Sequence, residues 1–454
     1  MTWHEQKTQI CVGGGHSDVT IHRRVWRMAG PIILSNVSVP LLGAVDTAVV
    51  GHLQHAYYIG AVGVGAVIFS FIFFIFNFLR MGTTAPTAQA VGAEDWAEVR
   101  AMLGRAWFLA LAIGGGLILL QLPIVTIAFW VVEASGEVET LAERYFLIRI
   151  WAAPAALSTY AIIGWFYGMQ EARIPLILQV GINVVNILLD LLFVFGLGWG
   201  VEGVAAASLI AEYAGMVAAI YFVLRHLKRL PPAQGYVRIF HLVKIKGILT
   251  FNGFIFLRTL CVVSGSAIFM TQGAKLGDVP LAANHVLYNF MLITSFGLDG
   301  LANAAEALIG QATGSRDRKS FDQAVRAVLL WSGVVGVINF LIYWLFGAAI
   351  VALLTDIVAV RVAAAEYLPW AIVMPLISVW AYTFDGIFLG ARRARTMLTC
   401  MVFSFVVYMV AMFTLLPAYD NHALWLALNA FLGLRGLTLM LCYPRLRREL
   451  HSQC

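Results

Sequence analysis

The sequence predicts an all-α polytopic membrane protein of twelve transmembrane helices, in two six-helix lobes related by a pseudo-two-fold axis along the membrane normal. Three observations predict this fold class. Hydrophobic residues make up 61% of the 454 residues, charged residues only 12%, and the mean hydropathy is +0.84, whereas soluble domains carry about 25% charged residues. The apolar residues form runs of about 20 or more, long enough to cross a bilayer. The two halves of the chain also resemble each other.

The expected helices follow from the apolar runs, taken in chain order. Short segments that are polar or rich in glycine and proline separate most of the runs. The predicted helices are 28–52, 57–80, 99–131, 139–168, 174–196, 200–226, 239–273, 281–304, 322–353, 360–390, 395–416 and 421–442.

The distribution of positive charge predicts the orientation in the membrane. If the N-terminus is cytoplasmic, most of the 30 Lys and Arg residues fall on that side, and the opposite loops hold only Arg144, Arg149, Lys275 and Arg361. Cytoplasmic loops are enriched in Lys and Arg, so both termini are expected in the cytoplasm. The net charge of +6 is therefore a signal of topology, and nucleic-acid binding is not expected.

An internal repeat connects the two halves at an offset of 222 residues. The segment 89–92 (QAVG) matches 311–314 (QATG), and Phe166 with Gly168 matches Phe388 with Gly390. A four-residue insertion after Gly314 is expected, to align Val99-Arg100 with Val325-Arg326. Because six spans return the chain to its starting side, the halves should be parallel repeats, a design that suits alternating access.

This repeat defines the expected organisation of the chain. The linker between the halves is polar, basic and proline-rich, and the five cysteines form no CxxC pair and suggest no disulfide framework. The expected parts are a disordered cytoplasmic tail (1–24), an N-lobe (25–227), a cytoplasmic linker (228–238), a C-lobe (239–443) and a basic cytoplasmic tail (444–454).

Two carboxylates inside apolar runs point to function. Asp46 lies in 31–51 and Asp190 in 174–197. Ionised carboxylates in hydrocarbon are costly and usually serve ion or solute pathways. Asn183 and Asn186 precede Asp190 at helical spacings of 3 and 4, which places the three on one helix face, toward protein or a water-filled cavity.

Neighbouring segments could complete this site. Ser208 of the next predicted helix offers a hydroxyl, and Glu212 lies one turn further. Two carboxylates in low dielectric titrate as a coupled pair, so Asp46 and Asp190 could share a proton. With Asn186 and Ser208 they could also supply oxygen ligands for a hard cation such as Na⁺. A purely structural polar network is the alternative.

The second half carries its own intramembrane charges. Asp299 and Glu306 are seven residues apart and share a helix face, and Arg258 is expected to neutralise one of them. With Asp385 and Arg435 these residues form either a buried ion-pair network or a functional site. No nucleophile–base pair and no HExxH motif lies near the intramembrane carboxylates, so neither an enzyme nor a bound transition metal is expected. The two-lobe repeat disfavours a passive channel.

The chain resembles the multidrug and toxic compound extrusion (MATE) transporters, and specifically their DinF-type branch. The resemblance covers about residues 25–445. It is carried by GPIILSNVSVPLLGAVDTAVVGHL (30–53), FLRMGTTAPTAQAVGA (78–93), NVVNILLDLLFVFGLGWGVEGVAAASLIAE (183–212), FGLDGLANAAEALIGQATG (296–314) and FDGIFLGARRART (384–396).

The resemblance implies a cation site at Asp46, Asn186, Asp190 and Ser208, with Pro31 bending the first helix. It implies antiport at a bacterial inner membrane, with H⁺ or Na⁺ entering as a drug-like, often cationic compound leaves. The expected partners are these small molecules, the ion and membrane lipid, with no cofactor and the protein acting as a monomer. The alternative on this scaffold is an exporter or flippase of a lipid-linked or metabolite substrate.

Overall fold

The computed structural model describes residues 17–51, 56–131, 136–233 and 237–453. A few side chains within these ranges, including that of Asp46, lie outside the described set. No strand occurs among the described residues. The chain forms two compact units, which we call the N-unit (Leu34–Asn252) and the C-unit (Met1–Ile33 with Gly253–Cys454).

The N-unit holds the helices of the first half. Helix α4 packs against α8, α5 against both, and α10 against α9 and α7. Buried Trp96 and Val99 of α5 and Trp165 and Phe166 of α8 form part of a core between these two helices. The helices are α3 (Ala56–Phe76), α4 (Phe78–Gly92), α5 (Trp96–Leu119), α6 (Gln121–Val131), α7 (Gly136–Arg149), η1 (Ile150–Ala152), α8 (Ala153–Gly168), α9 (Arg173–Asp190), η2 (Leu191–Gly196) and α10 (Gly200–Leu227).

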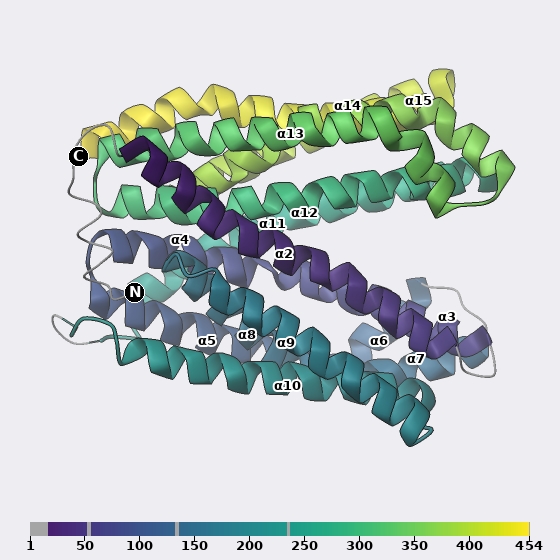
Figure 1. Ribbon diagram of the computed structural model, residues 1–454, viewed down its shortest axis with the longest axis horizontal. Coiled ribbons are helices and arrows are strands. Elements are labelled where there is room, and N and C mark those ends of the chain that lie inside the picture. The colour runs from purple at the N-terminus through teal and green to yellow at the C-terminus, as the bar shows by residue number, and fades with distance from the viewer. Residues whose placement is uncertain (1–16, 52–55, 132–135, 234–236, 454) are drawn as a thin grey trace. The chain divides into compact units, whose positions relative to one another are not determined.

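The C-unit is built from longer helices. Helix α14 packs against α12, α13 and α15, and these long helices lie side by side (Figure 1). Its core includes Phe269, Phe290, Tyr408 and Trp425. The helices are α11 (Leu242–Lys275), α12 (Asp278–Gly314), α13 (Arg318–Leu354), α14 (Val358–Gly390) and α15 (Ala394–Gln453).

Two helices pass from one unit to the other. The first, α2 (Ser17–Gly51), has its first half in the C-unit, where Arg24 donates a hydrogen bond to Gln311 of α12 (2.6 Å). Helix α11 has its first residues in the N-unit, where a Cβ on Gly82 of α4 would collide with Asn252. The compact units therefore divide the chain inside α2 and α11 rather than in the linker.

The predicted spans correspond to the observed helices. Ten helices among the described residues are long and apolar enough to cross a membrane. Helix α15 contains non-helical Asp420 (φ 45°, ψ −130°), which separates the last two predicted spans, and α2 covers the first. The span predicted at 57–80 is interrupted at Asn77, and the span predicted at 99–131 is interrupted at Leu120. Neither break was predicted, because both occur within apolar sequence in which the hydropathy stays high.

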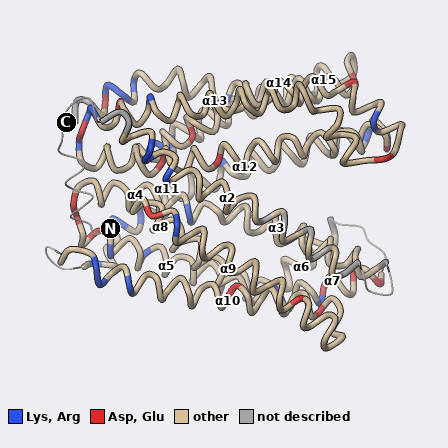
Figure 2. Tube along the Cα trace, viewed as in Figure 1, with Lys and Arg blue, Asp and Glu red and all other residues tan. Residues whose placement is uncertain are grey.

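Charged residues concentrate near helix ends. Within each unit, Lys and Arg gather toward one end of the helices and are sparse at the other (Figure 2). Residues 17–24, expected in the N-terminal tail, are helical, and so are 444–453. The reason at the N-terminus is packing, because Ile21, Val25 and Met28 are buried against the C-unit even though arginines interrupt the apolar pattern.

The repeat recurs in the backbone at the same 222-residue offset. Helices α4 and α12 end at Gly92 and Gly314, and α8 and α14 end at Gly168 and Gly390. The turns that follow use positive φ at equivalent residues: Glu94 and Arg316 (both 55°), and Gln170 (59°) and Arg392 (55°). The two halves thus share turn geometry as well as sequence.

The expected insertion after Gly314 is wrong. Asp95 caps α5 and Asp317 caps α13, still 222 residues apart. Gly114 packs against Pro154, and Gly336 packs against Pro375 and Val379 at the equivalent crossing. The match of Val99-Arg100 with Val325-Arg326 was therefore a coincidence of residue types in two helices whose register is set by their caps.

The side chain of Asp317 stabilises the start of α13 by capping its first backbone N–H groups. Its Oδ1 accepts from the backbone N–H groups of Lys319 (2.9 Å) and Ser320 (3.2 Å), and its Oδ2 accepts from the Ser320 hydroxyl (2.6 Å). Burial acts to raise the pKa of Asp317, but these hydrogen bonds and the Lys319 charge outweigh it and hold the pKa below its usual range. The stabilisation is therefore present above the unfolded-state pKa and is lost as the pH falls through the folded-state pKa.

We expect Asp317→Ala to lower the free energy of unfolding by about 1 kcal/mol at neutral pH, and by progressively less below about pH 4. Thermal unfolding of the purified protein at several pH values measures this difference. Asp317→Asn is the matched control, because it keeps an acceptor at the cap but cannot titrate. A wild-type advantage over alanine that persists unchanged at acid pH would contradict the assignment.

Candidate functional site

Asp190 lies where α9 changes its helical form. It is the last residue of α9, and the chain continues directly into the π-helical turn η2. Its side chain is completely buried (0% exposed) in the N-unit. Single π-turns inside helices frequently occur at functional sites, because they displace the helix register and leave backbone groups available. The sequence indicates the carboxylate but carries no signal for this turn.

Asn186 joins Asp190 to helix α10. Its amide nitrogen faces the carboxylate and donates to Oδ2 of Asp190 (2.9 Å), while its amide oxygen accepts from the hydroxyl (3.0 Å) and the backbone N–H (3.1 Å) of Ser208. This orientation of the amide is assigned from the hydrogen bonds, since the reverse would set the amide oxygen against a carboxylate. Asn186 and Ser208 are 2% and 5% exposed, so the structure brings together these predicted residues from adjacent helices.

Asn183 extends the polar face of α9 toward α2. Its amide nitrogen donates to the carbonyl (3.1 Å) and the hydroxyl (3.0 Å) of Ser38, and its oxygen accepts from Gln179 (3.3 Å). Ser38 belongs to the part of α2 that lies in the N-unit. Sequence reasoning did not find Ser38, because a single serine in an apolar helix does not differ from one that bonds its own backbone.

The other residues predicted on α2 are placed less completely. The side chain of Asp46 lies outside the described residues, so its pairing with Asp190 stays a prediction. Pro31 is half-buried and lies two residues before the point where α2 passes from the C-unit to the N-unit. A bending role for Pro31 stays a prediction.

Glu212 lies one turn beyond Ser208 on α10 and is half-buried. Arg149, at the end of α7, acts electrostatically on its carboxyl group. Arg149 itself lies over the rings of Phe69 (5.1 Å) and Tyr145 (5.4 Å). The N-unit thus contains a second acidic side chain on the helix that carries Ser208.

The intramembrane charges of the second half form a different arrangement from the expected one. Arg258 bonds Oδ2 of Asp385 rather than neutralising Asp299 or Glu306. The same oxygen also accepts from Arg435 (2.9 Å). Arg258 is separated from Asp385 by 127 residues, and helical spacing in a sequence carries no information about which distant helix faces a given residue. Asp299 is half-buried, and Glu306 is buried at 1% exposure.

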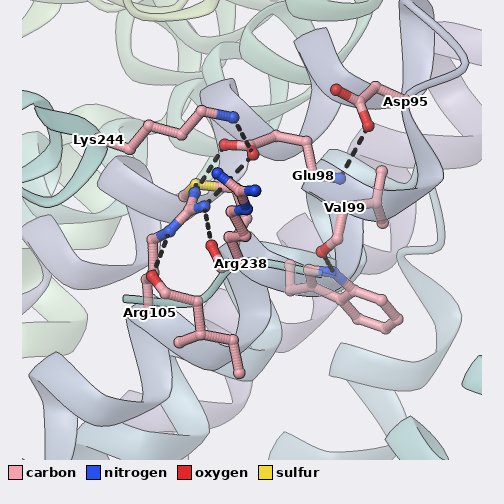
Figure 3. A network of polar contacts seen from close by, with 9 residues as sticks. Asp95, Glu98, Val99, Arg105, Arg238 and Lys244 are labelled. Carbon is pink, nitrogen blue, oxygen red and sulfur yellow. Dashed lines mark hydrogen bonds and ion pairs between the residues drawn. The ribbon is translucent and has the colours of Figure 1, made fainter. Parts of the chain in front are cut away.

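A polar network at the start of α5 was not foreseen (Figure 3). Arg105, 5% exposed, donates to Glu98 Oε1 (2.6 Å) and to the backbone carbonyls of Arg238 (2.7 Å) and Ile239 (2.9 Å). Lys244 bonds the other oxygen of Glu98 (2.5 Å). This Glu98–Arg105–Lys244 network therefore fixes the end of the linker and the start of α11 to α5.

We expect Arg105→Ala to release this segment, because no other side chain of the network can satisfy both carbonyls and Glu98 at once. Glu98 keeps its ion pair with Lys244, so the main loss is of the hydrogen bonds from the charged guanidinium, each worth about 1.5–3 kcal/mol. Limited trypsin digestion should cut after Arg238, Arg229 or Lys228 at least tenfold faster than in the wild type. Exposed Arg173→Ala is the control. An unchanged cleavage rate in Arg105→Ala would show that the network does not hold the linker.

The comparisons with known proteins identify the family of the chain. The MatE family model matches twice, over residues 31–192 and 255–414, once in each half of the repeat. The chain is 40% identical over 423 residues to DNA damage-inducible protein F of Escherichia coli, covering 93% of this chain and 92% of that protein. It is 23% identical over 339 residues to a probable multidrug resistance protein NorM of Photorhabdus laumondii, covering 70% and 71% of the two chains.

Solved structures of similar shape have the same architecture. An outward-facing multidrug resistance MATE family transporter of the MOP superfamily superposes with a TM-score of 0.85 at 19% identity, covering 95% of this chain and 97% of that one. The bent form of the Vibrio cholerae MATE transporter VcmN superposes with a TM-score of 0.84 at 19% identity, covering 96% and 99%. The two-lobe fold of twelve membrane helices is therefore confirmed, and the chain belongs to the MatE family of multidrug and toxic compound extrusion transporters, in its DinF-type branch.

Proposed function

We propose that this transporter is a cation-coupled antiporter, in which H⁺ or Na⁺ moves inward as a small, drug-like and often cationic organic compound is exported by alternating access. The observation that carries the proposal is the fully buried carboxylate of Asp190, hydrogen-bonded to Asn186, which in turn bonds Ser208 on the neighbouring helix. A carboxylate at such a position is costly unless a proton or another cation compensates its charge.

The chemistry of the site explains how an ion could be exchanged. When the carboxylate of Asp190 holds a proton or a cation, the buried site is close to neutral, and when the ion leaves, the negative charge must be compensated again. Each change alters which arrangement of the helices is favoured, and an ion drives transport only through such a difference in affinity between states. Asn186 and Ser208 supply the amide and hydroxyl groups that hold the carboxylate in place.

The remaining roles follow from position along α2. Asp46 is proposed as the second acidic group of the site, acting with Asp190 as a coupled pair. Pro31 is proposed to let α2 bend as the ion binds and leaves, since proline removes a helical hydrogen bond.

We also propose that the protein is a monomer in the cytoplasmic membrane of a bacterium, with both termini in the cytoplasm. The support is the concentration of Lys and Arg toward one end of the helices and the similarity to the Escherichia coli protein.

Transport in proteoliposomes tests this function and names the ion. The purified protein is reconstituted, and uptake of a cationic dye is followed after a pH gradient or a Na⁺ gradient is imposed separately. We expect one of the two gradients to drive accumulation of the dye above its equilibrium level. If neither gradient drives any tested cationic compound, coupled export of cationic drugs is excluded, and a lipid-linked or metabolite substrate becomes the better proposal for this scaffold.

A further inference from the structure

The C-unit contains two buried arginines that share one carboxylate oxygen. Arg258 of α11 and Arg435 of α15 both donate through Nη2 to Oδ2 of Asp385 on α14. The three residues are 9%, 4% and 6% exposed, in helices that cross the membrane. We call Arg258 and Arg435 the arginine pair. A guanidinium stays charged under all biological conditions, so Asp385 compensates only one of the two charges.

The hydrogen-bond donors of the arginine pair exceed the acceptors around it. The Nε atoms of both arginines are buried without a hydrogen-bond partner. Among the described residues, the only hydrogen bonds from the two side chains are those from Nη2 to Asp385. Leaving donors of a buried charged group unsatisfied costs more than leaving those of a neutral group, so these donors favour an additional acceptor that bears negative charge.

Two features of the surroundings limit what that acceptor can be. The guanidinium of Arg435 lies 5.9 Å from the ring centre of Tyr382 and 5.6 Å from that of Phe431, so an aromatic compound bound at the pair would meet aromatic side chains. Asp299 of α12 acts electrostatically on Tyr382, as do Arg435 and Asp385, but no hydrogen bond joins Asp299 to either arginine among the described residues. Asp299 thus lies within electrostatic range of Tyr382 but does not satisfy the donors of the arginine pair.

We propose that the arginine pair is a subsite for an anionic group, a carboxylate or sulfonate, on an exported aromatic compound. This inference rests on the proposed export function and extends its cargo from cations to zwitterions and organic anions. The planar guanidinium binds a carboxylate through paired N–H···O bonds, and each arginine keeps nitrogens that Asp385 does not use. The arginine pair lies in the C-unit, whereas Asp190 lies in the N-unit, so the two sites draw on different residues.

A matched pair of dyes tests the proposal. Rhodamine 110 carries a free carboxylate, and rhodamine 123 is its methyl ester, with the same aromatic rings. Binding of each dye to the purified protein is measured by fluorescence anisotropy in a maltoside detergent. We expect Arg258→Gln to weaken the binding of rhodamine 110 at least tenfold and to change that of rhodamine 123 by less than twofold. Arg258→Gln leaves Asp385 and Arg435 as a balanced ion pair, so the fold should survive.

The controls separate this proposal from its alternatives. Exposed Arg445→Gln should change neither dye, and Arg258→Lys should give an intermediate loss for rhodamine 110, because lysine keeps the charge without the planar donor set. Equal effects of Arg258→Gln on both dyes, or none on either, would overturn the subsite. So would competition by chloride with no preference for the carboxylate dye, because the pair would then hold an inorganic anion only. Gradient-driven transport of rhodamine 123 reports independently on the proposed export function.

Discussion

Replacing Gly386 with alanine is expected to lower the free energy of unfolding by about 3 kcal/mol or more, enough to prevent normal accumulation of the protein. A Cβ at this position would lie 2.3 Å from the backbone oxygen of Ala302, where α14 crosses α12. The obstacle is backbone within a continuous helix, so no side-chain rotation can relieve it. Glycine at such a crossing permits the close approach on which membrane helices depend.

The repeat supplies a second test of the same crossing. Gly164 is the equivalent of Gly386, and a Cβ on Gly164 would lie 2.3 Å from the backbone oxygen of Arg80. We expect Gly164→Ala to be destabilising to a similar extent. Gly115→Ala in α5 is the control, because nothing lies within 4 Å of its added Cβ, and alanine is favoured over glycine in a helix by about 1 kcal/mol. Size-exclusion chromatography of the heated, fluorescently tagged variants measures all three.

If Gly386→Ala and Gly164→Ala melt at the same temperature as the wild type, the helices do not cross as closely as the structure describes. If only one of the pair is destabilised, the two halves are not equivalent at this position. Either outcome would contradict the structural repeat, because the repeat places the same backbone contact in each unit.

Asp190→Asn is expected to reduce gradient-driven transport at least tenfold without preventing folding. Asparagine has nearly the shape of aspartate and can still bond Asn186, but it cannot take up a proton and carries no charge to attract Na⁺. Transport in proteoliposomes, driven by whichever gradient is effective for the wild type, measures the loss. Glu202→Gln is the control, since Glu202 is an exposed carboxylate at the start of α10 that pairs with Arg144.

Two further variants define the extent of the site. Asp46→Asn should abolish coupled transport as Asp190→Asn does, if the two carboxylates act together. Asn186→Ala should instead shift the pH or Na⁺ dependence of transport, because it removes the hydrogen bond that positions Asp190 but keeps the carboxylate. Full transport by Asp190→Asn would move the coupling site elsewhere, with Asp46, Glu212, Asp299, Glu306 and Asp385 as the remaining intramembrane carboxylates.

Much of the fold is readable from the sequence because a membrane imposes a simple rule. Helices must be about 20 apolar residues long to cross it, so the predicted spans match the observed helices. The rule does not detect breaks within apolar sequence, such as those at Asn77 and Leu120. It also does not recognise the amphipathic start of α2 at Ser17, where packing on the C-unit rather than hydropathy decides the structure.

Some contacts of the candidate site could likewise be predicted from the sequence, and others could not. Asn183, Asn186 and Asp190 follow one another at helical spacing, so their common face could be predicted, and the contact of Asn186 with Ser208 follows from α9 and α10 being neighbours in the chain. The partner of Arg258 could not be predicted, because Asp385 lies on a distant helix. The attachment of the linker by the Glu98–Arg105–Lys244 network could not be predicted either. Arg105 bonds the backbone carbonyls of residues 238 and 239, and every residue type has a backbone carbonyl.

Coupled transport as proposed requires Asp190 to exchange a cation when cargo binds, and direct measurement of that exchange tests it most directly. Purified protein is mixed with a transported cationic compound, and the release of protons to a soluble pH dye, or of radioactive Na⁺, is recorded. We predict that the wild type releases the ion upon binding and that Asp190→Asn, still folded and still binding the compound, releases none. Equal release by both proteins would contradict the central claim.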